Sequence, residues 1–436
     1  MIQRKIFLLI FTLFVTLSVF GNNIDQTDDT LVIDLQKCLS LTKKNNLDLK
    51  IEDIKLNNKK TSLYTSWNDF LPKINGSTGI DNSIKPDKLT TSLKLNLNMS
   101  LSLNVSNFLN VNQTILDYKS SKITYNYAVK KVEIELTKSF YNILLSEEYI
   151  KIKNYSLKNS KNWYELAKKR YNNGEISEID LLKSQYQYQN LAVEYENELK
   201  NHKISLLLLK QILNIDEEKE ISIKGQIPEI KDFKFDELSK VDLTKNIDNQ
   251  KLTFELESSK NQRNIKIANL TPSLSLGYSV GNSYTLTSNP NNNWDTLSSN
   301  FSVSISFSLD NLIPFSNTQM ELLNTNSAIT QNLIEIEKNK HKIKSDLLKI
   351  IFELKNTKDN FNNVVFNAEI AKKAYKLTEN EYNNGEKSIN DVIDGEEILN
   401  EANFKILSAK YDFIKNILDL ELLLNTDLSG DKNLVN

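Results

Sequence analysis

The chain has 436 residues, and its 54 basic and 56 acidic side chains give a formal net charge of -2. So balanced a charge argues against a polyanionic or polycationic partner, and no basic stripe indicates nucleic acid binding. The 10 glycines and 6 prolines are few for this length. We therefore expect few tight turns and long secondary-structure elements.

The first residues predict a secretory signal peptide at 1–21. Arg4 and Lys5 precede an apolar stretch, and Gly21 offers a small residue for cleavage. An uncleaved anchor is the alternative, but about 15 apolar residues fall short of the roughly 20 that a helical span needs. No later segment is as apolar, so we expect no transmembrane helix in the mature chain. Cys38 is the only cysteine, which excludes an intramolecular disulfide.

The pentapeptide Tyr-Asn-Asn-Gly-Glu occurs twice, at 171–175 and 382–386, and Asp180 and Asp391 each follow nine positions after the Tyr. The chain therefore consists of two copies of one unit of about 200 residues. The predicted boundaries are a first copy at 22–213, a linker at 214–243, a second copy at 244–425 and a C-terminal tail at 426–436.

Each copy begins with a polar helical pattern, at about 34–67 in the first, and a proline, Pro72 or Pro272, ends it. Two alternating segments follow, and they predict strands at 72–84, 89–105, 272–286 and 299–309. The run from 89 to 105 alternates apolar and polar residues throughout, whereas a typical globular strand has roughly 5–6 residues. A sheet over a soluble core is the alternative, but the length favours barrel strands with one face toward lipid and one toward a lumen.

Four strands cannot close a membrane barrel, since the smallest single-chain barrels have roughly eight. An open sheet edge in lipid leaves backbone groups unpaired at several kcal/mol each. If these strands lie in a membrane, several copies of the chain must share one barrel. The predicted fold class is mostly α with a membrane β-barrel part, in which each protomer adds four strands to a barrel and long coiled-coil helices to a helical barrel.

A long helical hairpin follows each strand pair, at about 111–213 and 317–424. A helix of about 60 residues is roughly 90 Å long and must project out of a membrane. Each hairpin turns at an Asn-Asn-Gly, where Gly174 and Gly385 fit the left-handed position after a helix end.

Carboxylates follow both turns. Asp180 and Asp391 each stand three residues after a Ser, which is the spacing of a capping box and a sufficient structural explanation for both. Asp394 lies one turn beyond Asp391 on the same helix face, where the first copy has Lys183. In a symmetric oligomer such carboxylates form rings, which select cations and bind multivalent ones. A solvated polar face is the alternative.

With these motifs the chain resembles the TolC family of outer-membrane efflux proteins over nearly all of the mature sequence. The shared motif is Tyr-x-x-Gly followed by Asp-Val-x-Asp. Its carriers are Tyr382, Gly385, Lys387, Asp391, Val392 and Asp394 in the second copy, and Arg170, Tyr171, Gly174 and Asp180 in the first. The resemblance implies a homotrimer, in which twelve strands form one outer-membrane barrel and twelve helices form a tunnel across the periplasm.

The resemblance also implies roles at the periplasmic entrance of the tunnel. Asp391 and Asp394 would line the constriction, and Tyr382, Lys387 and Asp180 would form a latch that holds it shut. The family usually has Arg where this chain has Lys387, and Lys lacks the bidentate fork, so a weaker latch is expected. Glu396 would add a charge near the constriction.

The predicted function is that of a passive exit duct of a tripartite efflux or type I secretion system, in the outer membrane of a Gram-negative bacterium. A periplasmic adaptor would dock at the tips, near Tyr171, Gly174 and Gly385, and an inner-membrane pump of RND, ABC or MFS type would supply the energy. No catalytic set, metal-ligand cluster or phosphate-binding Gly loop is visible, so we expect no enzymatic activity, cofactor or metal. A secreted coiled-coil fibre is the alternative, but it leaves the duplicated strands unexplained.

Overall fold

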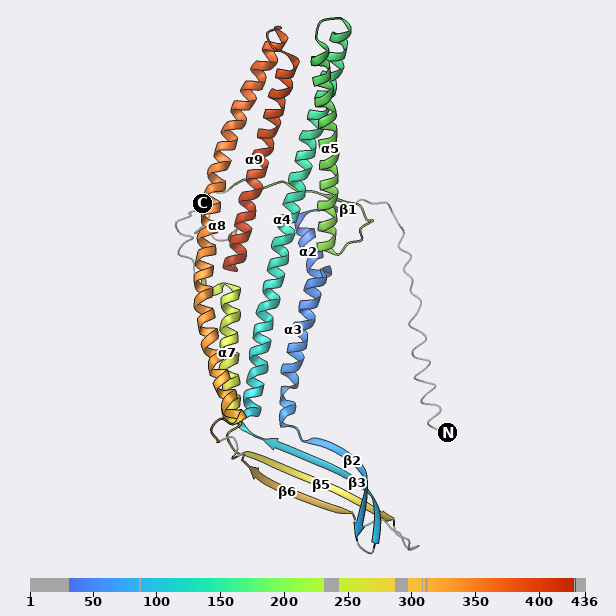
Figure 1. Ribbon diagram of the computed structural model, residues 1–436, viewed down its shortest axis with the longest axis vertical. Coiled ribbons are helices and arrows are strands. Elements are labelled where there is room, and N and C mark those ends of the chain that lie inside the picture. Colours follow the sequence, from blue (N-terminus) through green and yellow to red (C-terminus); the bar gives the residue numbers. More distant parts are fainter. Residues whose placement is uncertain are drawn as a thin grey trace, which may run out of the picture.

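Long helices run along the longest axis of the molecule, with a sheet at one end and two hairpin turns at the other (Figure 1). The computed structural model describes residues 31–85, 88–230, 243–286, 297–307, 309, 313–426 and 428. The predicted signal peptide at 1–21 and most of the predicted tail at 426–436 lie outside these residues.

Both copies order their elements as helix, strand pair and long hairpin. The first copy contains β1 (Leu31–Ile33), α2 (Leu35–Asn45), α3 (Leu47–Thr65), the 3-10 helix η1 (Ser66–Phe70), β2 (Lys73–Lys85), β3 (Lys88–Leu103), α4 (Val105–Asn172) and α5 (Glu178–Leu213). Strand β4 (Ile221–Ile223) lies between the copies. The second copy contains η2 (Leu243–Lys245), α7 (Ile247–Ala268), β5 (Ser273–Leu286), β6 (Ser298–Ser306), α8 (Asn317–Asn383) and α9 (Ile389–Leu424).

Several boundaries differ from the sequence predictions, and capping asparagines explain two of the differences. The pattern at 34–67 is broken at Asn46, whose side chain accepts a hydrogen bond from the N–H of Leu49 and begins α3. The strand predicted to run to 105 stops at Leu103, because Asn104 caps α4 in the same way. Helix α4 therefore starts six residues earlier than predicted. Strand β6 ends at Ser306 instead of 309.

The predicted linker contains the short strand β4, which pairs in parallel with β1. Their residues join one end of the first hairpin in a buried cluster. Cys38 belongs to this cluster as a free thiol, and burial raises its pKa to about 12. The cysteine is therefore a core residue.

The two hairpins are packed by equivalent residues, which confirms the internal duplication. Five of the six buried residues that the first hairpin gives to one cluster, all but Leu144, have a counterpart 211 positions later in a cluster of the second. The pairs are Leu136 and Leu347, Phe140 and Ile351, Ile143 and Leu354, Leu209 and Leu420, and Leu213 and Leu424.

The capping asparagines repeat this symmetry. Asn46 donates its side-chain amide to the carbonyl of Ile212 near the end of α5. Asn246 caps α7 and donates in the same way to Leu423 near the end of α9. One side chain thus starts a helix and ties it to the end of the return helix in each copy.

The four long strands form one antiparallel sheet in the order β2-β3-β5-β6. Its register places apolar residues opposite one another across strands, as in the row Met99, Tyr278 and Phe301. The alternate rows are polar, as in Ser102, Ser275 and Ser304. Since successive side chains point to opposite faces, one face of the sheet is apolar and the other polar.

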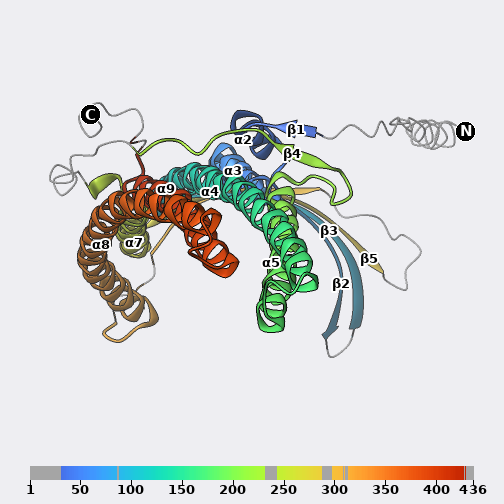
Figure 2. The same ribbon diagram turned by 90° about the horizontal axis from the view of Figure 1, so that it is seen from above.

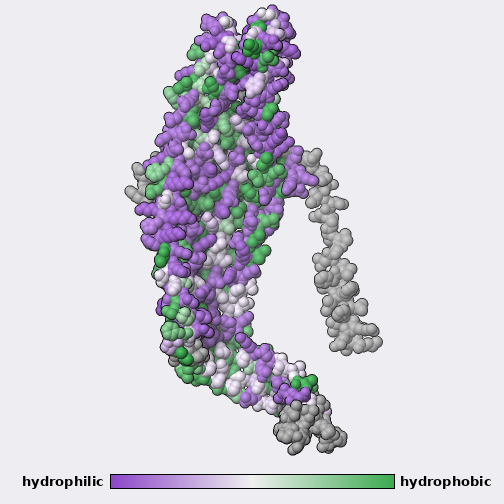
Figure 3. All heavy atoms as spheres, viewed as in Figure 1, coloured by the Kyte–Doolittle hydropathy of each residue, from purple (hydrophilic) through white to green (hydrophobic). Residues whose placement is uncertain are grey.

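Seen from above, the helices form a curved layer, with α8 toward one end and α5 toward the other (Figure 2). Hydrophilic residues predominate over the helical part on the face drawn in Figure 3, with hydrophobic patches among them. None of the helices in the described ranges combines the length and apolarity needed to cross a bilayer.

Candidate functional site at the hairpin tips

Each hairpin turns within a few residues, and a glycine makes the turn possible. Gly174 has φ 75° and Gly385 has φ 81°, both in the left-handed region that disfavours a side chain. The backbone N–H groups of Gly174 and Gly385 donate to the carbonyls of Tyr171 and Tyr382. The repeated pentapeptide therefore encodes two equivalent turns.

Capping bonds fix the first turn of each return helix. Ser388 and Asp391 form a complete capping box, in which the Asp391 carboxylate accepts from the N–H and hydroxyl of Ser388 at 2.8 and 2.7 Å. In the first copy the Asp180 carboxylate accepts from the Ser177 hydroxyl at 2.7 Å. The capping box that the spacing predicts is thus complete at Asp391, whereas at Asp180 the Ser177 side chain caps the helix without the reciprocal backbone bond.

The two aspartates of the second copy remain exposed despite this capping. Asp391 and Asp394 both face solvent on the first turns of α9. Hydrogen bonds from the side chain and backbone of Ser388 lower the pKa of Asp391, and Lys387 acts in the same direction. Asp391 therefore keeps its negative charge to more acid pH than an ordinary aspartate.

Tyr382, at the end of α8, is buried against the first hairpin. Its ring lies edge-on to the indole of Trp163 on α4, with centroids 5.6 Å apart and ring planes at 84°. The guanidinium carbon of Arg170 lies 5.2 Å from the ring centroid, within reach of a cation–π contact. The Tyr382 hydroxyl is buried and has no hydrogen-bond partner within the described chain.

The equivalent tyrosine of the first copy has a different environment. Tyr171 is 38% exposed, whereas Tyr382 is 8% exposed. Of the other two predicted latch residues, Lys387 is exposed and Asp180 bonds to Ser177 in its own turn. In the single chain, Tyr382 and Asp180 therefore do not contact each other and have different partners, although the partners of both lie on the first hairpin.

The sequence suggested that Glu396 adds a charge near the constriction, beside Asp394. The structure buries this side chain instead. It is 6% exposed, and its carboxylate accepts a hydrogen bond from the side-chain amide of Asn159 on α4. Burial raises the pKa of Glu396, while hydrogen bonds from Asn159 and Trp163 oppose the shift. Positions 394 and 396 lie on opposite faces of the helix because two residues span about 200°.

Sequence reasoning did not single out Asn159 or Trp163. They lie in the middle of a long helix, and no local motif marks either one. Together they join α4 to α8 and α9 through Tyr382 and Glu396. Among the residues that the structure describes, no group of His, Cys, Asp and Glu could hold a metal ion.

No family model and no curated protein matches the sequence. Solved structures with the same fold include outer-membrane channels, as the resemblance to the TolC family predicts. The fold of this chain is therefore that of an outer-membrane channel protein.

Three of these structures show how far the likeness extends. The CmeC outer membrane channel of Campylobacter jejuni has 17% sequence identity and a TM-score of 0.74, over 92% of this chain and 87% of CmeC. The outer membrane protein VceC of Vibrio cholerae has 13% identity and a TM-score of 0.75, over 90% and 96%. The MtrE outer membrane channel of Neisseria gonorrhoeae, in its open state, has 15% identity and a TM-score of 0.71, over 90% and 89%.

Proposed function

We propose that the chain is a homotrimeric outer-membrane exit duct of a tripartite efflux or type I secretion system, with a large periplasmic portion. The four-stranded sheet carries this proposal. It has one apolar and one polar face, and apolar side chains such as Phe301, Val303 and Ile305 are 66%, 58% and 74% exposed in the single chain. Such a sheet suits a wall with lipid on one side and an aqueous lumen on the other.

The sheet edges support an assembly of several copies. Strands β2 and β6 end the sheet order and run in opposite directions, because three antiparallel pairings separate them. Strand β6 of one copy can therefore pair antiparallel with β2 of the next. This pairing repeats around a ring and leaves no edge open to lipid.

The helices offer matching surfaces for the same assembly. Helices α5 and α8, at opposite ends of the helical layer, both expose large apolar side chains to water in the single chain (Figure 2). They are Ile179, Leu182, Tyr186 and Val193 on α5, and Phe352, Phe366, Ile370 and Leu377 on α8. Packing α8 of one copy against α5 of the next would cover both rows.

In such a trimer the hairpin tips form the periplasmic entrance. Asp391 and Asp394 would each become a ring of carboxylates that favours cations. Tyr382, Lys387 and Asp180 would form the contacts that hold the entrance closed. This part of the proposal rests on the family resemblance and on the exposure of both carboxylates.

Opening would come from outside the channel. A periplasmic adaptor would dock on the exposed turns around Tyr171, Gly174 and Gly385 and favour the open arrangement of the hairpins. An inner-membrane pump of RND, ABC or MFS type would supply the energy, so the channel itself needs neither a catalytic site nor a cofactor.

The test is to express the full chain in a Gram-negative host and follow its fractionation. We expect recovery from the outer membrane only with detergent, as a trimer that migrates as one band in an unheated denaturing gel and as a monomer after heating. Planar-bilayer recordings should then show cation-selective conductance. A monomer that stays soluble without detergent would overturn the proposal and favour the secreted fibre.

A further inference from the structure

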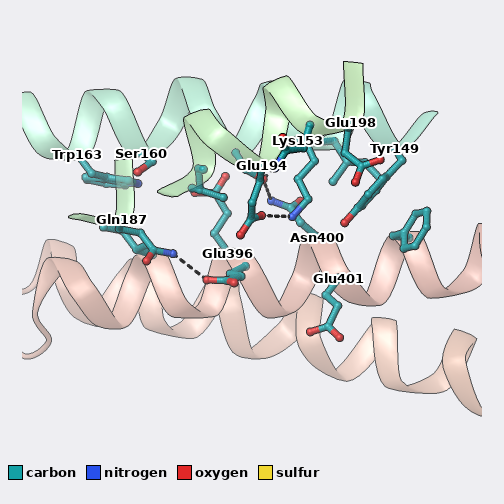
Figure 4. Close-up of a pocket in the computed structure, with 17 residues that line it drawn as sticks. Tyr149, Lys153, Ser160, Trp163, Gln187, Glu194, Glu198, Glu396, Asn400 and Glu401 are labelled. Carbon is teal, nitrogen blue, oxygen red and sulfur yellow. Dashed lines mark hydrogen bonds and ion pairs between the residues drawn. The ribbon is translucent and has the colours of Figure 1, made fainter. Parts of the chain in front are cut away.

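A cavity of about 440 Å³ lies between the two hairpins and is lined by residues of α4, α5 and α9 (Figure 4). Its volume falls in the range of pockets that hold small organic ligands, roughly 300–1,000 Å³. Leu191, Ile393 and Ser160 form its buried part, and Glu397 and Glu401 are exposed at its rim. The cavity is therefore open to solvent on its acidic side.

The lining carries an excess of negative charge. Glu194, Glu198, Glu396, Glu397 and Glu401 contribute carboxyl groups, and Lys153 supplies the only positive side chain. Two of the five have a cationic partner, because Lys153 pairs with Glu194 and Lys405 with Glu401. The other three have none within the described chain. An additional cation would thus find carboxyl groups without a positive partner.

The chain's own ammonium group shows how a cation fits this lining. The Lys153 nitrogen lies 2.6 Å from a carboxylate oxygen of Glu194 and 5.3 Å from the ring centroid of Tyr149. Carboxylate and aromatic face together are the usual surroundings of a bound ammonium ion. Trp163 and Phe404 offer further aromatic surface in the same cavity.

A second and independent feature indicates a ligand. Ser160 is 2% exposed and lines the cavity, and its hydroxyl has no hydrogen-bond partner within the described chain. Figure 4 shows Ser160 beside Trp163 on α4. A buried hydroxyl without a partner costs free energy, and a polar group of a ligand in the cavity would satisfy it.

We propose that this cavity binds a small organic ammonium ion with an apolar body. The ammonium group faces the Ser160 hydroxyl and the carboxyl groups of Glu396 and Glu397, and the apolar body lies against Trp163. Because the lining comes from both hairpins, an occupied cavity ties α9 to α4 and α5 and resists their separation. The inference rests on the geometry of one chain and stands apart from the exit-duct function.

Trp163 provides the readout. The sequence has three tryptophans, and replacing Trp67 and Trp294 by Phe leaves Trp163 as the only one. The purified full-length protein in detergent is titrated with phenethylammonium and, separately, with 2-phenylethanol, in which a hydroxyl replaces the ammonium. We expect a saturable change in Trp163 fluorescence with phenethylammonium, and at least about tenfold weaker binding of the alcohol.

Two variants and a control locate the ligand. Glu397→Gln removes one charge while keeping the shape, and should weaken phenethylammonium binding about tenfold. Ser160→Ala should weaken it about three- to tenfold. Glu196→Gln is the control, because Glu196 is exposed on α5 and does not line the cavity. Thermal unfolding of each variant verifies that it is folded.

Three results would overturn the proposal. Equal affinity for phenethylammonium and phenylethanol would show that the charge plays no part. Trp163 fluorescence that neither phenethylammonium nor 2-phenylethanol changes, in a folded protein, would mean that the cavity holds only water. Saturation by Mg²⁺ alone at lower concentration than the amine would define a site for inorganic cations instead.

Discussion

The ring of Tyr382 on α8 meets the indole of Trp163 on α4 edge-on, with centroids 5.6 Å apart, and so ties the second hairpin to the first near the tips. Aromatic pairs in this arrangement are stabilised by about 0.5–1.5 kcal/mol beyond their buried area. Arg170 adds a cation over the same tyrosine ring.

This contact predicts that the ring of Tyr382 matters more than its hydroxyl. Tyr382→Ala should destabilise the protein by about 3–5 kcal/mol and raise the open probability of the channel. Tyr382→Phe should change stability by less than about 0.5 kcal/mol, because the hydroxyl has no partner within the described chain. Denaturant unfolding and planar-bilayer recordings measure the two effects. A hydroxyl latch to a neighbouring copy gives the opposite result, with Tyr382→Phe alone opening the channel.

The raised pKa of Glu396 predicts that the free energy of unfolding falls as the pH rises. Burial raises the pKa of its carboxyl in the folded chain, so the folded state holds the proton more tightly than the unfolded state. The stabilisation is fully present below the pKa of an unfolded glutamate, about 4.3, and is lost as the pH rises through the folded pKa.

Glu396→Gln tests this pH dependence, since glutamine keeps an acceptor for Asn159 but cannot ionise. The variant should unfold at a higher temperature than the parent near neutral pH, and the difference should vanish in acid. Glu397→Gln, at an exposed neighbouring position, is the control and should show a much smaller dependence. A parent and a Glu396→Gln variant with parallel pH profiles would contradict the raised pKa.

The exposed carboxylates of α9 predict the ion selectivity of the proposed entrance. Changing both Asp391 and Asp394 to Asn removes the charges, while asparagine can still accept the capping bond from Ser388. Cation selectivity and block by multivalent cations should both decrease in planar bilayers. Glu178→Gln is the control, because it removes an exposed carboxylate from the first turn of α5 that belongs neither to the latch nor to the proposed constriction. Unchanged selectivity in the double variant would exclude these two residues from the constriction.

The two faces of the sheet predict opposite tolerance to charge. Val303 lies in an apolar row with Leu276 and Leu101, and Ser304 follows on the polar face. Val303→Lys should lower the stability of the barrel by about 2–4 kcal/mol at the depth of the bilayer midplane, and by less toward the bilayer surfaces. Ser304→Lys should be tolerated. The yield of heat-modifiable trimers in the outer membrane compares the two variants. Equal yields would argue against lipid on the apolar face.

Features encoded over short stretches could be predicted from the sequence. The repeated pentapeptide revealed two equivalent turns, since only glycine adopts the positive φ of Gly174 and Gly385 without strain. The alternation in β3 revealed the strand, but not its end. The alternation continues past Leu103, whereas the side chain of Asn104 begins the helix. Likewise, the helical pattern around Asn46 concealed a break, because asparagine fits a helical pattern as well as a cap.

The amino-acid sequence by itself determined the duplication, the strand and hairpin order, and the turns, because these depend on residues near one another in the chain. Only the tertiary structure decided the burial of side chains at the tips. Tyr171 and Tyr382 occupy the same position in one repeated motif, yet Trp163 covers only Tyr382. Asp394 faces solvent and Glu396 faces Asn159, more than 200 positions away. Burial, and with it pKa and ligand contacts, depends on such distant neighbours, which no local pattern specifies.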